Sequence, residues 1–222
     1  MKTIDFSVSE HNRVYSPFLL WNVKEEDVLS IFFKIAVIIL GSIIAAYGIT
    51  LAIGAGFGGA TLAVLWEGVA YTFNITIGTA SFAVALLMIA FALIYDKKQI
   101  YIGTIINQIF YSYFIDVFTQ LHQYPENFYL QLCIMLLGIV LFAVGTGIYA
   151  FVDWGRGSYE AVTFAIVERK HFQIKTVRMA LDAAVVIIGM LLGGQFGICT
   201  ILTILLSGPI IQLTIKALKR CL

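Results

Sequence analysis

The sequence has little charge. Of its 222 residues only 12% are charged, while 60% are hydrophobic. A soluble domain of this length needs more charged surface than this, because water must solvate its outer face. A lipid bilayer covers such an apolar excess, so the composition predicts an integral membrane protein. The formal net charge of +1 gives no basis for nucleic-acid binding.

The sequence also lacks the groupings of residues that mark most enzymes and metal sites. Its three cysteines lie far apart, and its three histidines, His11, His122 and His171, fall in predicted tails or loops. The sequence contains no HExxH, GxSxG or P-loop motif and no pair of carboxylates within one apolar run. We therefore expect a protein that is not an enzyme, with no catalytic residues, no metal and no cofactor.

Six apolar segments are long enough to cross a bilayer, which takes about 17–25 residues. They lie near residues 31–53, 79–95, 101–119, 129–151, 177–193 and 197–216. Two further apolar segments, Thr61–Phe73 and Ser158–Val167, are too short to span, and each follows a glycine-rich turn. We expect these two to be re-entrant or interfacial helices.

The basic residues give these spans an orientation. With the N-terminus in the cytoplasm, all 14 lysines and arginines fall on the inner side, and the outer connections 54–78, 120–128 and 193–196 contain none. Cytoplasmic loops of membrane proteins carry this excess of positive charge. We therefore expect a multi-pass plasma-membrane protein with both the N-terminus and the C-terminus in the cytoplasm.

The second half of the chain repeats the first. A shift of 97 positions places Gly58 on Gly155. After one residue is lost in a hairpin, a shift of 96 places Thr104 on Thr200. Each copy holds three spans, an odd number, so the copies must have opposite orientations in the bilayer. Inverted repeats of this kind occur in secondary transporters, which bind their substrates near the midplane at the repeat interface.

The fold class predicted from these patterns is all-α, with six transmembrane helices arranged as two inverted three-helix repeats, each with a short re-entrant or interfacial helix. The predicted organisation is a cytoplasmic tail over residues 1–27, a first membrane repeat over 28–119, an outer loop over 120–128, a second membrane repeat over 129–217 and a cytoplasmic C-terminus over 218–222.

Polar residues follow one face of the third predicted span. Asn107 lies deep in this span, and Asp116 lies about one turn from its outer end. Polar side chains inside a membrane protein usually face the interior of the helix bundle. We therefore consider Asn107 and Asp116 candidate substrate-binding residues, although Asp116 is close enough to the outer end to reach water instead.

Two irregular places supply the remaining candidates. Arg156 and Gly157 lie in the turn before a short helix, whose exposed N–H groups attract anions, and Glu160 is in its first turn. The alternative is that the glycines only permit a chain reversal and that Glu160 only suits the helix dipole. Gly208 and Pro209 lie inside the sixth span, where proline predicts a kink or a break. This break is either a ligand site or a packing kink.

Two acids in apolar segments have open interpretations. Asp182 follows Arg178 by four residues, which favours an ion pair within one helix over a proton-coupling carboxylate. Glu67, in the first short segment, either lines a cavity or lies at the outer interface.

Glycine-rich motifs in the second half carry a family resemblance. Residues Gly155–Thr163 match the pattern G-x-G-x-x-[DE]-A-[LV]-T, and Gly197–Leu202 with Gly208–Ile211 match G-[IT]-G-T-[LI]-[LI]-x(5)-G-P-[FI]-[IL]. These motifs resemble those of the YczE/YitT group of bacterial multi-pass membrane proteins. The length of the chain is similar to that of the YczE-like branch, since YitT-like relatives carry an added soluble C-terminal domain. Cys199 replaces the usual glycine. Gln212 replaces a common aspartate, which Asp116 keeps in the first copy. The resemblance implies a bacterial plasma-membrane location and no settled activity.

Three functions agree with these observations. The first is a secondary-transporter-like protein that binds or moves a small polar solute, with the lipid bilayer as its other partner. The second is the substrate-binding subunit of an energy-coupling vitamin transporter, which an inverted repeat disfavours. The third is a non-transporting accessory or regulatory membrane protein acting through the basic loop Arg169–Arg178. Association of the chain with copies of itself is compatible with each of them.

Overall fold

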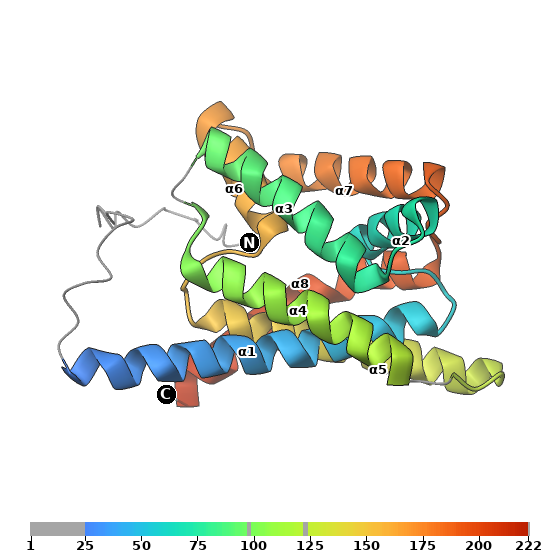
Figure 1. Ribbon diagram of the computed structural model, residues 1–222, viewed down its shortest axis with the longest axis horizontal. Helices are drawn as coiled ribbons and strands as arrows, with labels where there is room; N and C mark the ends of the chain where they lie inside the picture. Colours follow the sequence, from blue (N-terminus) through green and yellow to red (C-terminus); the bar gives the residue numbers. More distant parts are fainter. Residues whose placement is uncertain (1–24, 97–98, 122–123, 222) are drawn as a thin grey trace, which may run out of the picture.

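The structure, a computed structural model, describes residues 25–96, 99–121 and 124–221. This part of the chain forms eight helices and contains no strand (Figure 1). The helices are α1 (Glu25–Gly54), α2 (Thr61–Phe73), α3 (Ile77–Tyr95), α4 (Ile102–Leu121), α5 (Phe128–Phe151), α6 (Ser158–Lys170), α7 (Ile174–Leu191) and α8 (Ile198–Cys221). An all-helical protein is therefore confirmed, and every segment predicted to be apolar and helical is a helix. Most of the predicted N-terminal tail, residues 1–24, lies outside the described residues.

Four helices, α1, α3, α5 and α8, contain stretches long and apolar enough to cross a membrane. The other two predicted spans are more polar. Helix α4 has 20 residues and includes Asn107 and Gln108. Helix α7 has 18 residues and includes Lys175, Arg178 and Asp182. Apolar length alone thus supports four of the six predicted crossings.

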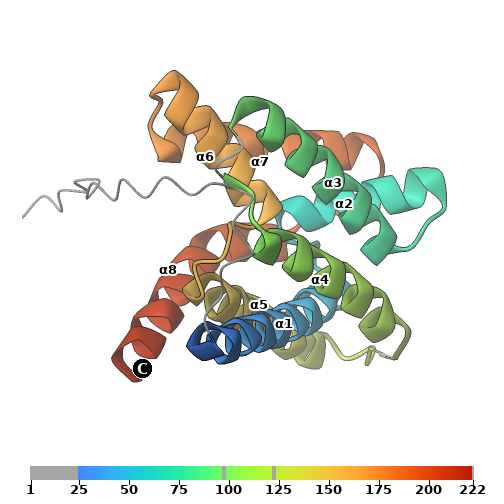
Figure 2. The ribbon, with the colours of Figure 1, turned by 60° about the vertical axis from the view of Figure 1, so that its left-hand side comes forward.

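The helices form two groups that lie side by side (Figure 2). Helices α1, α4, α5 and α8 make one group, in which α1 packs along α5 while α4 packs on α1 and α8 packs on α5. Helices α2, α3, α6 and α7 make the other group, in which α2 packs on α7 and α3 packs on α6. Each half of the chain therefore contributes two helices to each group.

Small residues allow α1 and α5 to approach closely. A Cβ atom added to Gly48 would lie 2.2 Å from the Phe142 nitrogen, and one added to Gly145 would lie 2.3 Å from the Ala45 nitrogen. Membrane helices associate by such close packing of small residues, because lipid gives no hydrophobic drive for two helices to meet. Contact of the backbones along α1 and α5 holds the two halves of the chain together.

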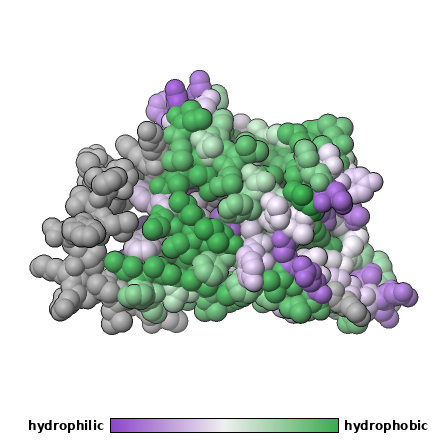
Figure 3. Space-filling model, viewed as in Figure 1, coloured by the Kyte–Doolittle hydropathy of each residue, from purple (hydrophilic) through white to green (hydrophobic). Residues whose placement is uncertain are grey.

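The surface is apolar over much of the face shown in Figure 3. Large apolar side chains such as Leu87, Ile94 and Leu213 are exposed. In water this exposure would be costly, whereas lipid solvates these side chains. The surface therefore agrees with the membrane protein predicted from composition.

Helix α8 continues through Pro209, so of the kink or break predicted at Gly208 and Pro209 only the break is wrong. Proline removes one backbone donor and disturbs one turn, and the turns on either side keep their own hydrogen bonds. Figure 2 shows α8 as an arc rather than a straight rod. The proline is therefore accommodated by bending, as is common in membrane helices.

Candidate functional site

A cavity of about 390 Å³ lies between the two groups of helices. This volume is within the range of small-molecule sites in proteins. Its walls come from both halves of the chain, with residues of α1, α2 and α4 from the first half and of α5, α6, α7 and α8 from the second. A second cavity of about 330 Å³ adjoins it, since the two share Thr146, Tyr149, Gly157, Glu160, Arg178 and Gly208.

The structure brings most of the predicted site residues together. Asn107, Gly157, Glu160 and Gly208 line the larger cavity, and Arg156 lines the adjoining one. A Cβ atom added to Gly208 would meet nothing within 4 Å, so this glycine faces open space. The two cavities are not lined by Asp116 or Pro209.

The polar face of α4 points into the protein interior, as the sequence predicts. Asn107 is buried, and its side-chain oxygen lies 2.7 Å from the Ser42 hydroxyl of α1. The amide of the next residue, Gln108, donates to the Ser112 hydroxyl one turn further along α4 at 2.8 Å, and Ser112 shares a 2.7 Å hydrogen bond with Ser81 of α3. These bonds tie α4 to α1 on one side and to α3 on the other, while Asn107 and Gln108 also face the cavity.

Asp116 has a clear structural partner. Its carboxylate accepts a hydrogen bond from the Gly78 N–H at 2.7 Å and another from the Thr76 hydroxyl at 2.6 Å. Both donors lie at the N-terminus of α3, where unpaired N–H groups favour a negative charge. Asp116 therefore caps α3 and fastens it to α4, away from the cavity.

The N-terminus of α6 already has a carboxylate beside it. The Glu160 side chain and the Tyr149 hydroxyl are so close to Gly157 that an added Cβ atom would lie 2.4 and 2.5 Å from them. An incoming anion would meet this carboxylate, so the structure favours the interpretation of Glu160 as a residue that suits the helix dipole.

Arg156 lies in the same turn, with its guanidinium carbon 3.4 Å from the centroid of the Phe164 ring. Burial lowers the pKa of Arg156, while the carboxylates of Glu168, Asp153 and Glu160 act in the opposite direction. An arginine stacked on a ring in this way is held in one place at the wall of the adjoining cavity.

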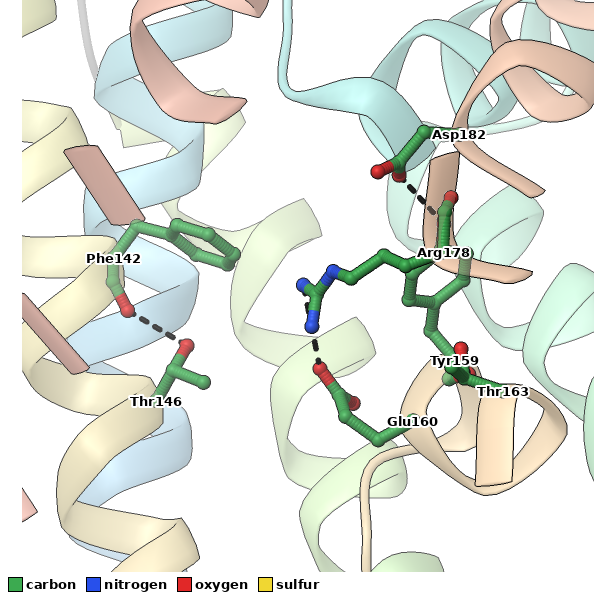
Figure 4. A network of polar contacts seen from close by, with 7 residues as sticks. All are labelled: Phe142, Thr146, Tyr159, Glu160, Thr163, Arg178 and Asp182. Carbon is green, nitrogen blue, oxygen red and sulfur yellow. Dashed lines mark hydrogen bonds and ion pairs between the residues drawn. The ribbon is translucent and has the colours of Figure 1, made fainter. Parts of the chain in front are cut away.

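Two charged residues of α7, Arg178 and Asp182, have partners on α6 (Figure 4). The Arg178 guanidinium lies 4.0 Å from the Glu160 carboxylate, and the Tyr159 hydroxyl donates to Asp182 at 2.5 Å. Within the described residues no ion pair joins Arg178 to Asp182, so the predicted pairing within α7 is wrong. The reason is tertiary, since α6 packs beside α7 and offers each of these side chains a nearer partner.

Several lining residues were missed by sequence reasoning. Trp66, Phe142, Tyr149 and Tyr159 give the larger cavity an aromatic wall, and Lys175 adds a charge. Aromatic residues are common in lipid-facing and core positions of any membrane helix, so nothing in the pattern distinguishes the ones that line a cavity.

Tyr111 is the most informative of these residues. It is only 8% exposed, and its hydroxyl is the only buried side-chain nitrogen or oxygen without a hydrogen-bond partner among the described residues. A buried hydroxyl without a partner costs about 1–3 kcal/mol. The spacing of Asn107 and Tyr111, one helical turn apart on the polar face of α4, was the available signal, since both line the cavity.

Glu67 lies on α2, outside both cavities. Its carboxylate accepts a hydrogen bond from the Gln195 N–H at 3.1 Å, in the connection between α7 and α8. Burial raises the pKa of Glu67 to about 7, and the Gln195 hydrogen bond opposes the rise. Of the two interpretations left open by the sequence, a role for Glu67 in lining either of these two cavities is not supported.

Comparison with known proteins agrees with the resemblance seen in the motifs. Residues 32–216 match a family model described as a family of unknown function, DUF6198. An uncharacterised protein of Haemophilus influenzae is 27% identical over 90% of this chain and 88% of its own. The uncharacterised membrane protein YczE of Bacillus subtilis is 27% identical over 87% of this chain and 88% of its own. The uncharacterised protein YyaS of Bacillus subtilis is 24% identical over 82% of this chain. No solved structure matches.

Proposed function

The chain belongs to DUF6198, a family of unknown function, and is similar to the membrane protein YczE; from that premise we propose that it is a secondary-transporter-like protein that binds and moves a small polar solute. The solute occupies the cavity between the two groups of helices. The proposal contains six membrane crossings in two inverted repeats, in a bacterial plasma membrane, with both ends of the chain in the cytoplasm. It includes no chemical conversion of the solute.

The observation that carries this proposal is the position of the cavity between two halves of the chain whose helix contacts are related by a twofold exchange. The shift of 97 positions places Gly41 on Gly138 and Gly48 on Gly145. In the structure Gly41 approaches Gly145, and Gly48 approaches Gly138. The shift therefore exchanges one contact for the other, which is the behaviour of two copies related by a twofold axis.

The other helix contacts support the same symmetry. Exchange of the two copies turns the α1–α4 contact into the α5–α8 contact and the α2–α7 contact into the α6–α3 contact, and all four are present. Transporters built from inverted repeats bind their substrates at the repeat interface. Here that interface contains the cavity, with Asn107 from the first copy and Glu160 and Gly208 from the second.

The proposed topology is testable by cysteine labelling. We would replace Cys133, Cys199 and Cys221 with serine, and then introduce Glu126→Cys or Lys170→Cys, two exposed positions. A membrane-impermeant maleimide applied to intact cells should label position 126 and leave position 170 unlabelled until the cells are permeabilised. Labelling of both from the same side would remove the inverted repeat and the transport model with it.

Solute binding and movement need a separate experiment. A metabolite panel is screened for compounds that raise the melting temperature of detergent-purified protein, because a ligand that binds only the folded state stabilises it. Each hit is then tested for flux into liposomes. Asn107→Ala should abolish uptake of a hit, whereas Gln120→Ala, exposed on the same helix, should leave uptake unchanged. Binding without flux would leave a receptor or accessory role, and no hit at all would contradict the proposal.

A further inference from the structure

The wall of the larger cavity carries two acids and two bases. Glu160 and Asp182 supply the negative charges, and Lys175 and Arg178 supply the positive ones. These formal charges cancel, so a ligand with a net charge would leave an uncompensated charge in a partly desolvated site. A neutral ligand, or a ligand with one charge of each sign, avoids that cost.

Two of these four charges have no ionic partner. Arg178 and Glu160 form the only ion pair among the described residues, so neither Asp182 nor Lys175 is in one. Asp182 accepts a hydrogen bond from the neutral Tyr159 hydroxyl, which leaves its charge without an opposing charge. The cavity therefore presents an unpaired anion and an unpaired cation on the same helix.

The one ion pair is also loose. The distance of 4.0 Å from the Arg178 guanidinium to the Glu160 carboxylate exceeds the usual length of a charge-assisted hydrogen bond, about 2.7–2.9 Å. A guanidinium has five N–H donors, so Arg178 retains donors for a ligand carboxylate. Figure 4 shows its side chain extending from α7 into the space between α6 and Phe142 of α5.

Another part of the cavity wall is apolar and aromatic. Trp66 and Tyr111 stand edge to face with ring centroids 5.9 Å apart, and Ile49 and Phe142 lie in the same wall. The hydroxyl of Tyr111 has no hydrogen-bond partner among the described residues and still needs an acceptor or donor. A ligand with an apolar part and a polar end satisfies both features.

We propose that the cavity binds a free α-amino acid with an apolar or aromatic side chain. Its carboxylate lies against Arg178 and Lys175, its ammonium group lies against Asp182, and its side chain lies against Trp66 and Phe142. Arg178 and Asp182 are four residues apart on α7 and therefore lie on one face of the helix. This inference rests on the proposed function and names the class of solute.

The test uses Trp66 as the reporter, because it lines the cavity and Trp154, the other tryptophan in the described part of the chain, does not. In the variant Trp21→Phe, Trp154→Phe, we would titrate phenylalanine, phenethylamine and 3-phenylpropionate, which share an apolar part and differ in charge. The leucine set, with 3-methylbutylamine and 4-methylpentanoate, is titrated in parallel. Each amino acid should quench or shift Trp66 emission at a concentration at least about tenfold below that of its amine or acid, a difference of about 1.4 kcal/mol.

Two charge-neutralising variants then separate the two ends of the ligand. Asp182→Asn keeps an acceptor for Tyr159, and it should weaken amino-acid binding about tenfold or more while binding of 3-phenylpropionate does not weaken. Arg178→Gln should have the complementary effect: it should weaken binding of the amino acid and leave binding of phenethylamine unchanged. The matched control is Lys170→Gln, an exposed cation of α6 that lines neither cavity. Because the probes are compared within each variant, a general loss of stability does not mimic the result.

A lipid head group offers similar charges, so nanodiscs with and without phosphatidylethanolamine are compared. Competition between this lipid and phenylalanine for Trp66 would assign the zwitterion site to lipid and overturn the free amino acid. Equal binding of amine, acid and amino acid would also overturn it. A response to glucose or inorganic phosphate, with none to the amino acids, would overturn this inference while leaving solute binding intact.

Discussion

The two copies of the repeat differ most where α3 meets α4 and where α7 would meet α8. In the first copy the two helices are in contact, and Ser81 bonds to Ser112. The equivalent positions in the second copy are Arg178 and Gly208, which both line the cavity. The cavity therefore occupies, in the second copy, the place that helix contact fills in the first.

The cap on α3 shows the same difference. Asp116 fastens the N-terminus of α3 through Gly78, whereas the equivalent residues of the second copy are Gln212 and Lys175. Glutamine lacks the charge that favours a helix N-terminus, and lysine is far larger than glycine. The residues that join α3 to α4 in the first copy therefore have no equivalent pair in the second. Under the proposed function, one closed and one open helix pair would correspond to one of the two states of a transporter with alternating access.

The first prediction has the largest expected effect, because one pair of introduced cysteines should form a disulfide almost completely and the other pair almost not at all. In a chain lacking its native cysteines, Ser81→Cys with Ser112→Cys should form a disulfide quickly under mild oxidation, because the two hydroxyls are 2.7 Å apart. Arg178→Cys with Gly208→Cys should stay reduced, because the cavity separates these positions. Free thiols are counted by mass spectrometry after alkylation. Similar rates for the two pairs would show that the copies do not differ.

The second prediction concerns the glycine that permits contact between α3 and α4. A Cβ atom at Gly78 would lie 2.2 Å from the Ser112 carbonyl oxygen, so Gly78→Ala should force the helices apart at a cost of about 3 kcal/mol. Gly208→Ala, which places a Cβ atom in open space, should change stability by less than about 0.5 kcal/mol. Unfolding in detergent with increasing denaturant measures both. Equal losses would mean that α7 and α8 are packed as tightly as α3 and α4.

The third prediction removes the cap on α3. Asp116→Ala leaves the Gly78 N–H and the Thr76 hydroxyl without their acceptor, and it should destabilise the protein by about 1–2 kcal/mol. The matched change at the equivalent position, Gln212→Ala, should have almost no effect, because Gln212 is exposed. Both are measured by the same denaturant unfolding. If Gln212→Ala lowers the stability as much as Asp116→Ala does, then Gln212 also caps a helix in the second copy.

The fourth prediction has the smallest effect and concerns a position where the copies carry different chemistry. Glu67 corresponds to Phe164 in the second copy, the ring on which Arg156 stacks. Burial raises the pKa of Glu67 in the folded protein from 4.5 to about 7, so the folded state binds more protons than the unfolded state between these values. Stability should therefore fall as the pH rises from 5 to 8.

Glu67→Gln keeps an acceptor for the Gln195 N–H and cannot ionise, so the part of this pH dependence that belongs to Glu67 should disappear. Melting temperatures at pH 5, 6, 7 and 8 for both proteins test this expectation. If the melting temperatures of the wild-type protein and the variant change in parallel with pH, Glu67 is in contact with water and has an ordinary pKa.

Much of the architecture was predictable because bilayer dimensions and helix periodicity act on local stretches of sequence. The glycine-rich turns predicted the starts of α2 and α6, and the polar face of α4 predicted that Asn107 points inward. The same patterns failed for Asp116, which looked like a site residue and is a cap, and for Arg178, whose partner is Glu160 rather than Asp182. In each case the deciding partner comes from another helix.

By itself the sequence determined that this chain is a helical membrane protein with a duplicated plan, because apolar length, charge placement and the repeat are properties of the chain alone. Only the tertiary structure decided that α3 closes on α4 while α7 stays apart from α8, and that four charges and the Tyr111 hydroxyl share one cavity. Those outcomes depend on distances between side chains that lie far apart in the sequence, and no local sequence pattern records such distances.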